Sequence, residues 1–165
     1  MGIYYTELLV KVIFNEEIIT EEFFKGIISN LKIAIRVRDF REGRAGQNTK
    51  HKDSPSIKVI SYGPGKNSKH STEGDPIYFW KDSNGNIQLN YENIKSFDSK
   101  EKKYIENFIN HNYINLTNYW FAPKNISNSI ELEKYQNDIK LRILNNISNI
   151  DYRKEQEKID DEVTI

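Results

Sequence analysis

Three histidines are the side chains in this sequence best suited to proton transfer, because an imidazole ordinarily changes its charge between about pH 5 and 8. His51 is the first candidate, since a lysine flanks it on each side and Arg36 and Arg38 precede it in the chain. In such a cluster the imidazole moves protons while the cations stabilise charge developing on a phosphoryl group. The cluster predicts a small metal-independent ribonuclease or, with no catalysis, an electrostatic contact surface.

A second candidate is His70, which stands in the tripeptide His70-Ser71-Thr72. This tripeptide resembles one half of the paired His-x-Thr motif of two-histidine phosphoesterases, in which each histidine is an acid or base and each hydroxyl holds a phosphate oxygen. Neither His51 nor His111 is followed by the second copy of the motif. His70 is therefore a candidate for phosphoester chemistry, with a histidine in a surface loop as the alternative.

Positive charge is concentrated between residues 32 and 69, where only Asp39, Glu42 and Asp53 oppose it. Such a stretch can contact phosphate groups, and it can equally bind an acidic protein surface. We therefore predict a binding surface for a protein partner, which includes a nucleoprotein or a nuclease, and direct contact with nucleic acid is the alternative. The predicted binding residues are Arg36, Arg38, Arg41, Arg44, Lys50, Lys52, Lys58 and Lys66.

Composition sets limits on this surface and on the rest of the chain. The 165 residues carry 24 basic and 24 acidic side chains, so the formal net charge is zero and bulk charge assigns no partner. The absence of cysteine removes disulfides, thiolate nucleophiles and zinc sites built on sulfur. The acidic residues show no spacing typical of a metal-binding loop. We therefore expect neither a metal nor a cofactor.

The first third of the sequence predicts strands and one helix. Residues 4–14 are rich in aromatic and β-branched side chains and predict a single central strand. Thr20 can cap a helix whose apolar residues recur at helical spacing as far as Leu31. In the next predicted strand, residues 32–40, alternate positions share a face. We expect one face, with Ile33, Ile35 and Val37, to be buried, and the other, with Ala34, Arg36 and Arg38, to be basic and exposed.

The middle of the chain predicts a further strand and a hairpin. Residues 56–62 have strand character and precede the breaker Gly63-Pro64-Gly65. Residues 77–81 and 87–91 then flank a segment that contains Asn84-Gly85. Because this dipeptide tolerates positive φ angles, it predicts a tight turn between two antiparallel strands.

The last third predicts two amphipathic helices. Asp98 with Glu101 has the spacing of a capping box and begins the first helix, which Pro123 should end. Ser129 can cap the second helix, whose apolar side chains recur every three or four residues as far as Ile147. Leu116 and Trp120 are expected in the core. The predicted interface anchors, on the reasoning that buried tyrosines dominate interface energy, are Tyr113, Tyr119 and Tyr135.

These elements predict an α+β fold, with an antiparallel or mixed sheet of about five strands, one N-terminal helix and two C-terminal helices. Residues 1–150 form a single domain in this interpretation. Residues 151–165 are net acidic and lack an apolar pattern, which is typical of a tail without a fixed structure unless the basic region of this chain or of a second copy holds it. The N-terminus lacks the features of a signal peptide and no stretch is apolar enough to span a membrane, so a cytoplasmic protein is expected.

Part of the sequence resembles a small uncharacterised bacterial family that is encoded beside toxin–antitoxin genes. That family has a His-x-Pro-Pro-His-x-His-Val loop and strand, then a hairpin and a helix ending in Leu-x-x-x-Trp. The corresponding segments here are residues 51–59, which begin His51-Lys52-Asp53-Ser54-Pro55, residues 79–89, and Leu116-Thr117-Asn118-Tyr119-Trp120. Ser56 and Lys58 replace two of the family's histidines. The resemblance implies a protein of bacterial conflict or mobile-element systems, without a reaction.

Three functional hypotheses follow from the sequence. The first is a binding or inhibitor module, for example a phage-encoded inhibitor of a host defence nuclease or a toxin–antitoxin partner. The second is a small metal-independent ribonuclease or phosphoesterase that uses His51 or His70. The third is a homo-oligomeric structural protein, such as a homodimer, in which the acidic tail binds the basic loops of a second copy.

Overall fold

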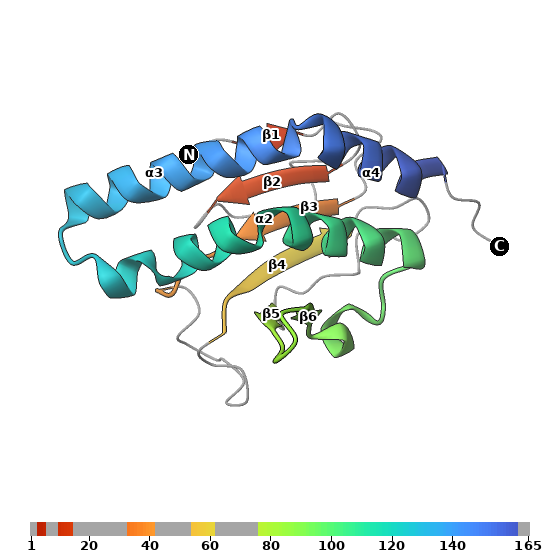
Figure 1. The fold of residues 1–165 in the computed structure, drawn as a ribbon, viewed down its shortest axis with the longest axis horizontal. Helices are drawn as coiled ribbons and strands as arrows, with labels where there is room; N and C mark the ends of the chain where they lie inside the picture. Colours follow the sequence, from red (N-terminus) through yellow and green to blue (C-terminus); the bar gives the residue numbers. More distant parts are fainter. Residues whose placement is uncertain (1–2, 6–9, 15–32, 42–53, 62–75, 162–165) are drawn as a thin grey trace.

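The computed structural model describes residues 3–5, 10–14, 33–41, 54–61 and 76–161. Six strands precede a short 3₁₀ helix, η1, and three α-helices (Figure 1). The strands are β1 (Ile3–Tyr5), β2 (Val10–Phe14), β3 (Ile33–Val37), β4 (Ser56–Ser61), β5 (Ile77–Lys81) and β6 (Ile87–Leu89). The helices are η1 (Tyr91–Ile94), α2 (Ser99–Asn125), α3 (Ser129–Ile147) and α4 (Ile150–Asp161). The predicted α+β class is therefore confirmed.

The strands form one mixed sheet in the order β1-β2-β3-β4-β5-β6. Only β2 and β3 are parallel, with Val12 beside Ile35, and the other neighbouring pairs are antiparallel. The prediction of a single central strand over residues 4–14 is wrong, because this run contains both β1 and β2 and β1 lies at the edge of the sheet. Strand propensity is continuous through the run and does not reveal where the chain reverses.

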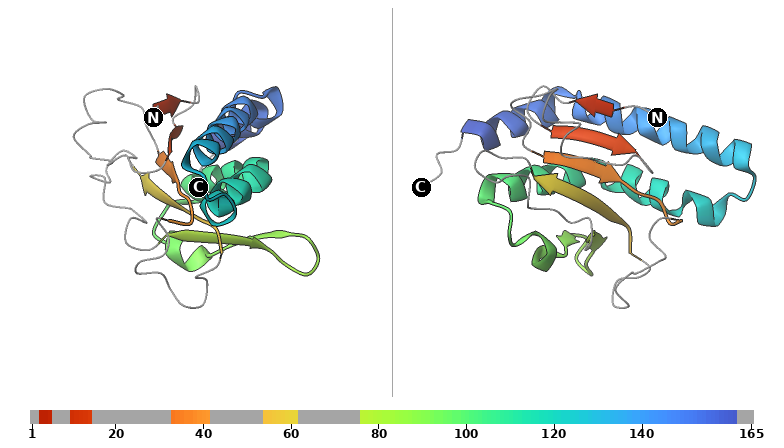
Figure 2. Two further views of the ribbon diagram at one scale, coloured as in Figure 1. Left: turned by 90° about the vertical axis from the view of Figure 1, so that its left-hand side faces the viewer. Right: turned by 180° about the vertical axis from the view of Figure 1, so that it is seen from behind.

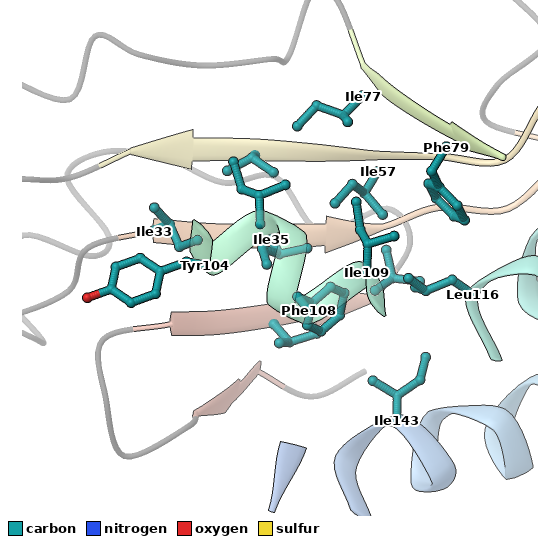
Figure 3. Close-up of a cluster of buried hydrophobic side chains, with 14 of the residues drawn as sticks. Ile33, Ile35, Ile57, Ile77, Phe79, Tyr104, Phe108, Ile109, Leu116 and Ile143 are labelled. Carbon is teal, nitrogen blue, oxygen red and sulfur yellow. The ribbon is translucent and has the colours of Figure 1, made fainter. Parts of the chain in front are cut away.

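All three α-helices cover the same face of the sheet (Figure 2). Figure 3 shows the core between the two layers, where strand residues such as Ile33, Ile35 and Ile57 face Phe108 and Ile109 of α2. Each of these side chains is fully buried. The predicted inward face of β3 is thereby confirmed. The side chains at the intervening positions of β3 and β4, such as Arg36 and Lys58, point away from this core.

The hairpin between β5 and β6 is built as predicted. Gly85 has a φ of 80°, a conformation that a residue with a Cβ adopts only at a cost. One carboxylate oxygen of Asp82 accepts hydrogen bonds from the backbone N–H groups of Asn84 and Asn86, each at 2.9 Å. The bond from Asn86 is the main reason that the pKa of Asp82 lies below its usual value. The turn therefore supplies its own polar contacts.

Helix α2 begins with the predicted capping box. The Asp98 side chain accepts from the Glu101 backbone N–H at 2.8 Å, and Glu101 Oε1 accepts from the Asp98 N–H at 2.9 Å. The other Glu101 oxygen accepts a hydrogen bond from the buried Ser61 hydroxyl of β4. The cap thus fixes the start of α2 to the sheet as well as satisfying its own backbone groups.

Helix α2 continues past Pro123, so the prediction that this proline ends the helix is wrong. Proline has no N–H to donate to the carbonyl group four residues earlier, which belongs to Tyr119. Gln136 Nε2 of α3 donates to that carbonyl oxygen instead, at 3.3 Å. A side chain from the neighbouring helix therefore replaces the missing intrahelical bond and lets α2 extend to Asn125.

Helix α3 buries Leu132, Ile139, Ile143 and Ile147, which confirms the predicted stripe, and the three isoleucines belong to the hydrophobic core. Its N-cap is Asn128 in place of the predicted Ser129: the Asn128 side chain accepts from two backbone N–H groups at 3.0 Å. Asparagine is at least as good as serine at this position, and the sequence pattern does not separate neighbouring candidates.

The acidic segment after residue 150 forms a helix, so the prediction of a tail without fixed structure is wrong for residues 151–161. Tyr152, Gln156 and Ile159 are buried at helical spacing and hold α4 against α2. Two apolar residues in the eleven positions 151–161 are too sparse a pattern to stand out in the sequence. The Tyr152 hydroxyl and the Gln156 amide are buried without a hydrogen-bond partner in the described part of the chain.

The described α-helices are therefore three, and all of them follow the last strand, in place of the two C-terminal helices predicted. The predicted helix between Thr20 and Leu31 lies outside the described residues. Within the described ranges, no helix combines the length and the apolar character needed to cross a membrane.

Candidate functional site

Cationic side chains meet where β3 ends and β4 begins. Arg36 of β3 and Lys58 of β4 are directly opposed partners in the antiparallel pair. Directly opposed residues point to the same face of a sheet, and here it is the face away from the core that contains Ile35 and Val59. Both cationic side chains are half-buried. The strand register thus brings together two of the predicted binding residues that are 22 positions apart in the sequence.

The prediction that Arg38 lies on an exposed basic face is wrong, because only 4% of this residue is accessible to solvent. Its Nη1 donates to the Ser56 hydroxyl at 2.7 Å, and its guanidinium carbon lies 5.7 Å from the centre of the Trp120 ring. Ala34, on the same predicted face, is fully buried as well, and Arg36 is half-buried, so β3 has no exposed face. The hydroxyl and the aromatic ring replace water around the Arg38 guanidinium group.

A buried carboxylate fixes the turn that follows Arg38. Asp39 is 1% exposed, and Arg41 Nη2 donates to its Oδ2 at 2.6 Å while the Arg41 backbone N–H donates to Oδ1 at 3.0 Å. Gln136 Nε2 of α3 donates to the same Oδ2 at 3.0 Å. The Arg41 side chain is 57% exposed, so its guanidinium reaches the surface from a fixed base. Fixing a cation in this way lowers the entropy that binding must remove.

Phe40 provides the apolar part of this surface. Its backbone N–H donates to the Trp120 carbonyl oxygen at 2.8 Å, and the two rings meet edge to face with centres 6.3 Å apart. Lys124, at the end of α2, places its Nζ 5.4 Å from the centre of the Phe40 ring. Helix α2 therefore holds the half-buried phenylalanine and adds an exposed cation beside it. We name this surface the basic sheet end; it consists of Arg36, Phe40, Arg41, Lys58 and Lys124.

Two contributors to this arrangement were not found by sequence reasoning. Lys124 and Gln136 lie far along the chain from the basic stretch, and neither belongs to a motif. The only sequence signal for Gln136 is a polar residue one position after the apolar Tyr135, on the inner side of an amphipathic helix. Lys124 carries no such signal, because a lysine in the last turn of a helix is ordinary.

The other predicted binding residues, Arg44, Lys50, Lys52 and Lys66, lie outside the described residues, as do both candidate catalytic histidines, His51 and His70. In the sequence, Arg44, Lys50 and Lys52 stand between Arg41 and Ser54, which are the last and first described residues on either side of them. The catalytic hypotheses thus remain predictions. In the described ranges, no three His, Cys, Asp or Glu side chains are placed to hold a metal ion.

The predicted interface anchors have different environments. Tyr119 is fully buried with its ring centre 6.0 Å from that of Phe14, so its role as an exposed anchor is wrong. Helix α2 shares the hydrophobic core with the strands and packs against two other helices, so its buried surface is broader than a single stripe. Tyr113 and Tyr135 are half-buried at the margin of the core. Leu116 and Trp120, 2% and 1% exposed, are core residues as predicted.

Similarity to known proteins gives no further assignment for the basic sheet end. Comparisons of this chain with family models, with curated proteins and with solved structures find no match.

Proposed function

We propose that this protein is a non-enzymatic binding module that holds an acidic surface of another protein against the basic sheet end. The observation that carries the proposal is a set of cations at this end of the sheet: Arg36 opposes Lys58 across β3 and β4, Arg41 is held by Asp39 in the following turn, and Lys124 of α2 lies over Phe40. Complementary charge of this kind accelerates association and selects against partners of the wrong sign. The only carboxylate in the arrangement described above, Asp39, is buried beneath this surface.

An acidic protein fits this surface better than stacked nucleic acid bases do. Binding of single strands usually relies on aromatic faces on which bases stack. Here the Lys124 ammonium group lies over the Phe40 ring, and that ring packs against Trp120 in a T-shaped arrangement. The ring is thus already engaged, whereas Arg41 and Lys124 offer charge at the surface. Carboxylates of a partner can pair with these cations without displacing the aromatic packing.

The resemblance of residues 51–59 and 116–120 to a family from toxin–antitoxin loci supports a partner from a bacterial conflict or mobile-element system. A module that inhibits a defence nuclease, or that neutralises a toxin, needs a stable contact surface and no catalytic group of its own. The rigid attachment of Arg41 to Asp39 and Gln136 suits such a role, because preorganised side chains lose little freedom on binding.

The direct test compares two charge reversals on exposed lysines. Lys124→Glu alters the basic sheet end, and Lys134→Glu, on the exposed side of α3, is the matched control. Fluorescence anisotropy with labelled poly-L-glutamate should show binding that Lys124→Glu weakens by about threefold to tenfold, as expected for exposed charge pairs. Raising the ionic strength should weaken the wild-type interaction in the same assay.

The natural partner is then sought by affinity capture from the native host with both variants, followed by mass spectrometry. A protein retained by wild type and by Lys134→Glu, and lost with Lys124→Glu, supports the proposal. Equal weakening by both variants would show that the contact lacks a defined surface. Tighter binding of labelled RNA or DNA than of poly-L-glutamate, or cleavage of either in chelator that His51→Ala or His70→Ala abolishes, would overturn it in favour of a nucleic-acid function.

A further inference from the structure

A groove separate from the basic sheet end lies between the β5–β6 hairpin and helices α2 and α3. Its volume is about 360 Å³, which falls within the usual range for small-molecule sites. Lys81 and Ile87 line it from the hairpin, and Asn146 lines it from α3. Helix α2 contributes the whole segment from Asn110 to Asn115, which contains His111 and Tyr113. We name it the hairpin groove.

The ionisable side chains of the hairpin groove are all basic or neutral. Lys81 and His111 come from different elements and are both exposed, and no acidic residue is among the described residues that line the groove. The Lys81 ammonium lies 5.0 Å from the centre of the Tyr113 ring. Within the described part of the chain, neither this ammonium nor the ring nitrogens of His111 make a hydrogen bond. Two side chains that can donate therefore line one hollow, Lys81 beside Tyr113 and His111 beside Tyr152.

The contacts that hold the walls of the groove together use neither the Lys81 ammonium nor the ring nitrogens of His111. Asn146 Nδ2 donates to the His111 carbonyl oxygen at 3.2 Å and to Asn112 Oδ1 at 3.3 Å, which joins α3 to α2. The His111 ring meets the buried Tyr152 ring of α4 edge to face, with centres 5.1 Å apart. The imidazole is thus positioned by packing, and its nitrogen atoms are not used for that purpose.

Apolar surface completes the site on the hairpin side. The Tyr113 ring packs edge to face on the buried Phe79, with centres 5.8 Å apart, so its position is fixed by the core. Ile87 is half-buried, and Ile114 is 67% exposed at the rim. A ligand that fills the groove can therefore place an apolar body on Tyr113 and the isoleucines while its polar end faces the basic side chains.

We propose that the hairpin groove binds a small organic anion, whose negatively charged group lies between Lys81 and His111 and whose apolar body contacts Tyr113 and Ile87. A phosphate monoester and a carboxylate share the chemistry that these donors recognise. Tyr113, predicted from the sequence as an anchor for a protein partner, becomes a wall of a small-molecule site. The site shares no residue with the basic sheet end, so the failure of one proposal would not affect the other.

Nuclear magnetic resonance titration of the full chain tests the proposal with three aromatic probes. Phenyl phosphate and benzoate carry the two anionic groups, and benzamide has the shape of benzoate without its charge. Saturable shifts of the backbone amides of Asn110, Tyr113 and Asn115 are expected with at least one anion and not with benzamide. The anion that binds more tightly identifies the source as a phosphate or a carboxylate.

Single substitutions then locate the site. Lys81→Gln and His111→Gln should each weaken binding of the better anion by about threefold to tenfold, while Lys134→Gln, an exposed lysine on α3, leaves it unchanged. His111→Gln retains the backbone carbonyl that Asn146 contacts, and circular dichroism checks that each variant folds. The proposal is overturned if neither anion shifts these resonances at millimolar concentration, if benzamide shifts them equally, or if Lys134→Gln weakens binding as much as the other two variants.

Discussion

Replacing Asp39 by asparagine should destabilise the protein, although the two side chains have nearly the same shape. The carboxylate is 1% exposed, and each of its oxygens accepts hydrogen bonds: Oδ1 from Arg41, and Oδ2 from Arg41 and Gln136. Asparagine keeps one oxygen and replaces the other by an NH₂ group. In either orientation of the amide that donor meets a mismatch: Arg41 offers only N–H groups, and turning the Gln136 amide to present its oxygen would break its bond to the Tyr119 carbonyl oxygen.

The size of the effect follows from the exposure of the two partners. The bond from Gln136 is buried, and losing a hydrogen bond to a charged acceptor costs about 1.5–2 kcal/mol in that setting. Arg41 is 57% exposed and can bind water instead, so the loss of its ion pair costs only about 0.5–1 kcal/mol. The free energy of unfolding should therefore fall by about 2–3 kcal/mol, and the Tm by roughly 4–12 °C for a chain of this length.

Chemical denaturation of Asp39→Asn, followed by circular dichroism, measures this loss, with Asp138→Asn on the exposed side of α3 as the matched control. A second variant, Gln136→Leu, removes the donor from α3. Because both changes break the same contact, the double variant should be less destabilised than the sum of the single ones. A loss below about 0.5 kcal/mol for Asp39→Asn, or full additivity with Gln136→Leu, would refute the view that this carboxylate joins the β3 turn to α3.

Substitutions at three further positions test other parts of the fold. Gly85→Ala should cost about 1–2 kcal/mol in thermal or denaturant unfolding, because φ is 80° at this turn; an unchanged midpoint would mean that the turn relaxes freely. Glu101→Ala should cost about 1–3 kcal/mol, since it removes the capping box and the acceptor of the buried Ser61 hydroxyl. Glu101→Gln should cost much less, because glutamine can satisfy both contacts, and equal losses would contradict this assignment. Burial raises the pKa of Tyr152, so its neutral form favours the folded state: this contribution is intact below the unfolded pKa of about 10 and is lost as the pH rises beyond it. Tyr152→Phe should lessen the fall in stability above about pH 10 without lowering stability at neutral pH, and an identical alkaline profile would exclude Tyr152 as a cause.

Several features of the structure could be predicted from short stretches of sequence, because the residues that decide them are close neighbours in the chain. The alternation of Ile33, Ile35 and Val37 correctly gave the inward face of β3. Asn84-Gly85 identified the hairpin, and Asp98 with Glu101 identified the start of α2. In each case the spacing of a few residues determines which face is buried or which backbone group is satisfied.

The role of each cation in the candidate site was decided only by tertiary structure. Arg38 and Arg41 look equivalent in the sequence, yet Arg38 is buried against Trp120 and Arg41 is exposed and fixed to Asp39. The contact between Asp39 and Gln136 spans 97 positions in the chain. Whether a charged group is buried depends on which distant side chains pack around it, and no local pattern records that packing.

The same distinction explains the fate of the C-terminal segment. Its sequence determined that residues 151–165 are polar and acidic, and that any helix there would bury few apolar side chains. Only the packing of α4 on α2 decided that Tyr152 and Ile159 find a surface to bury against. Sequence sets local conformation through short-range sterics and hydrogen bonds, whereas burial is a property of the assembled layers, because it requires complementary surfaces from parts of the chain that are far apart.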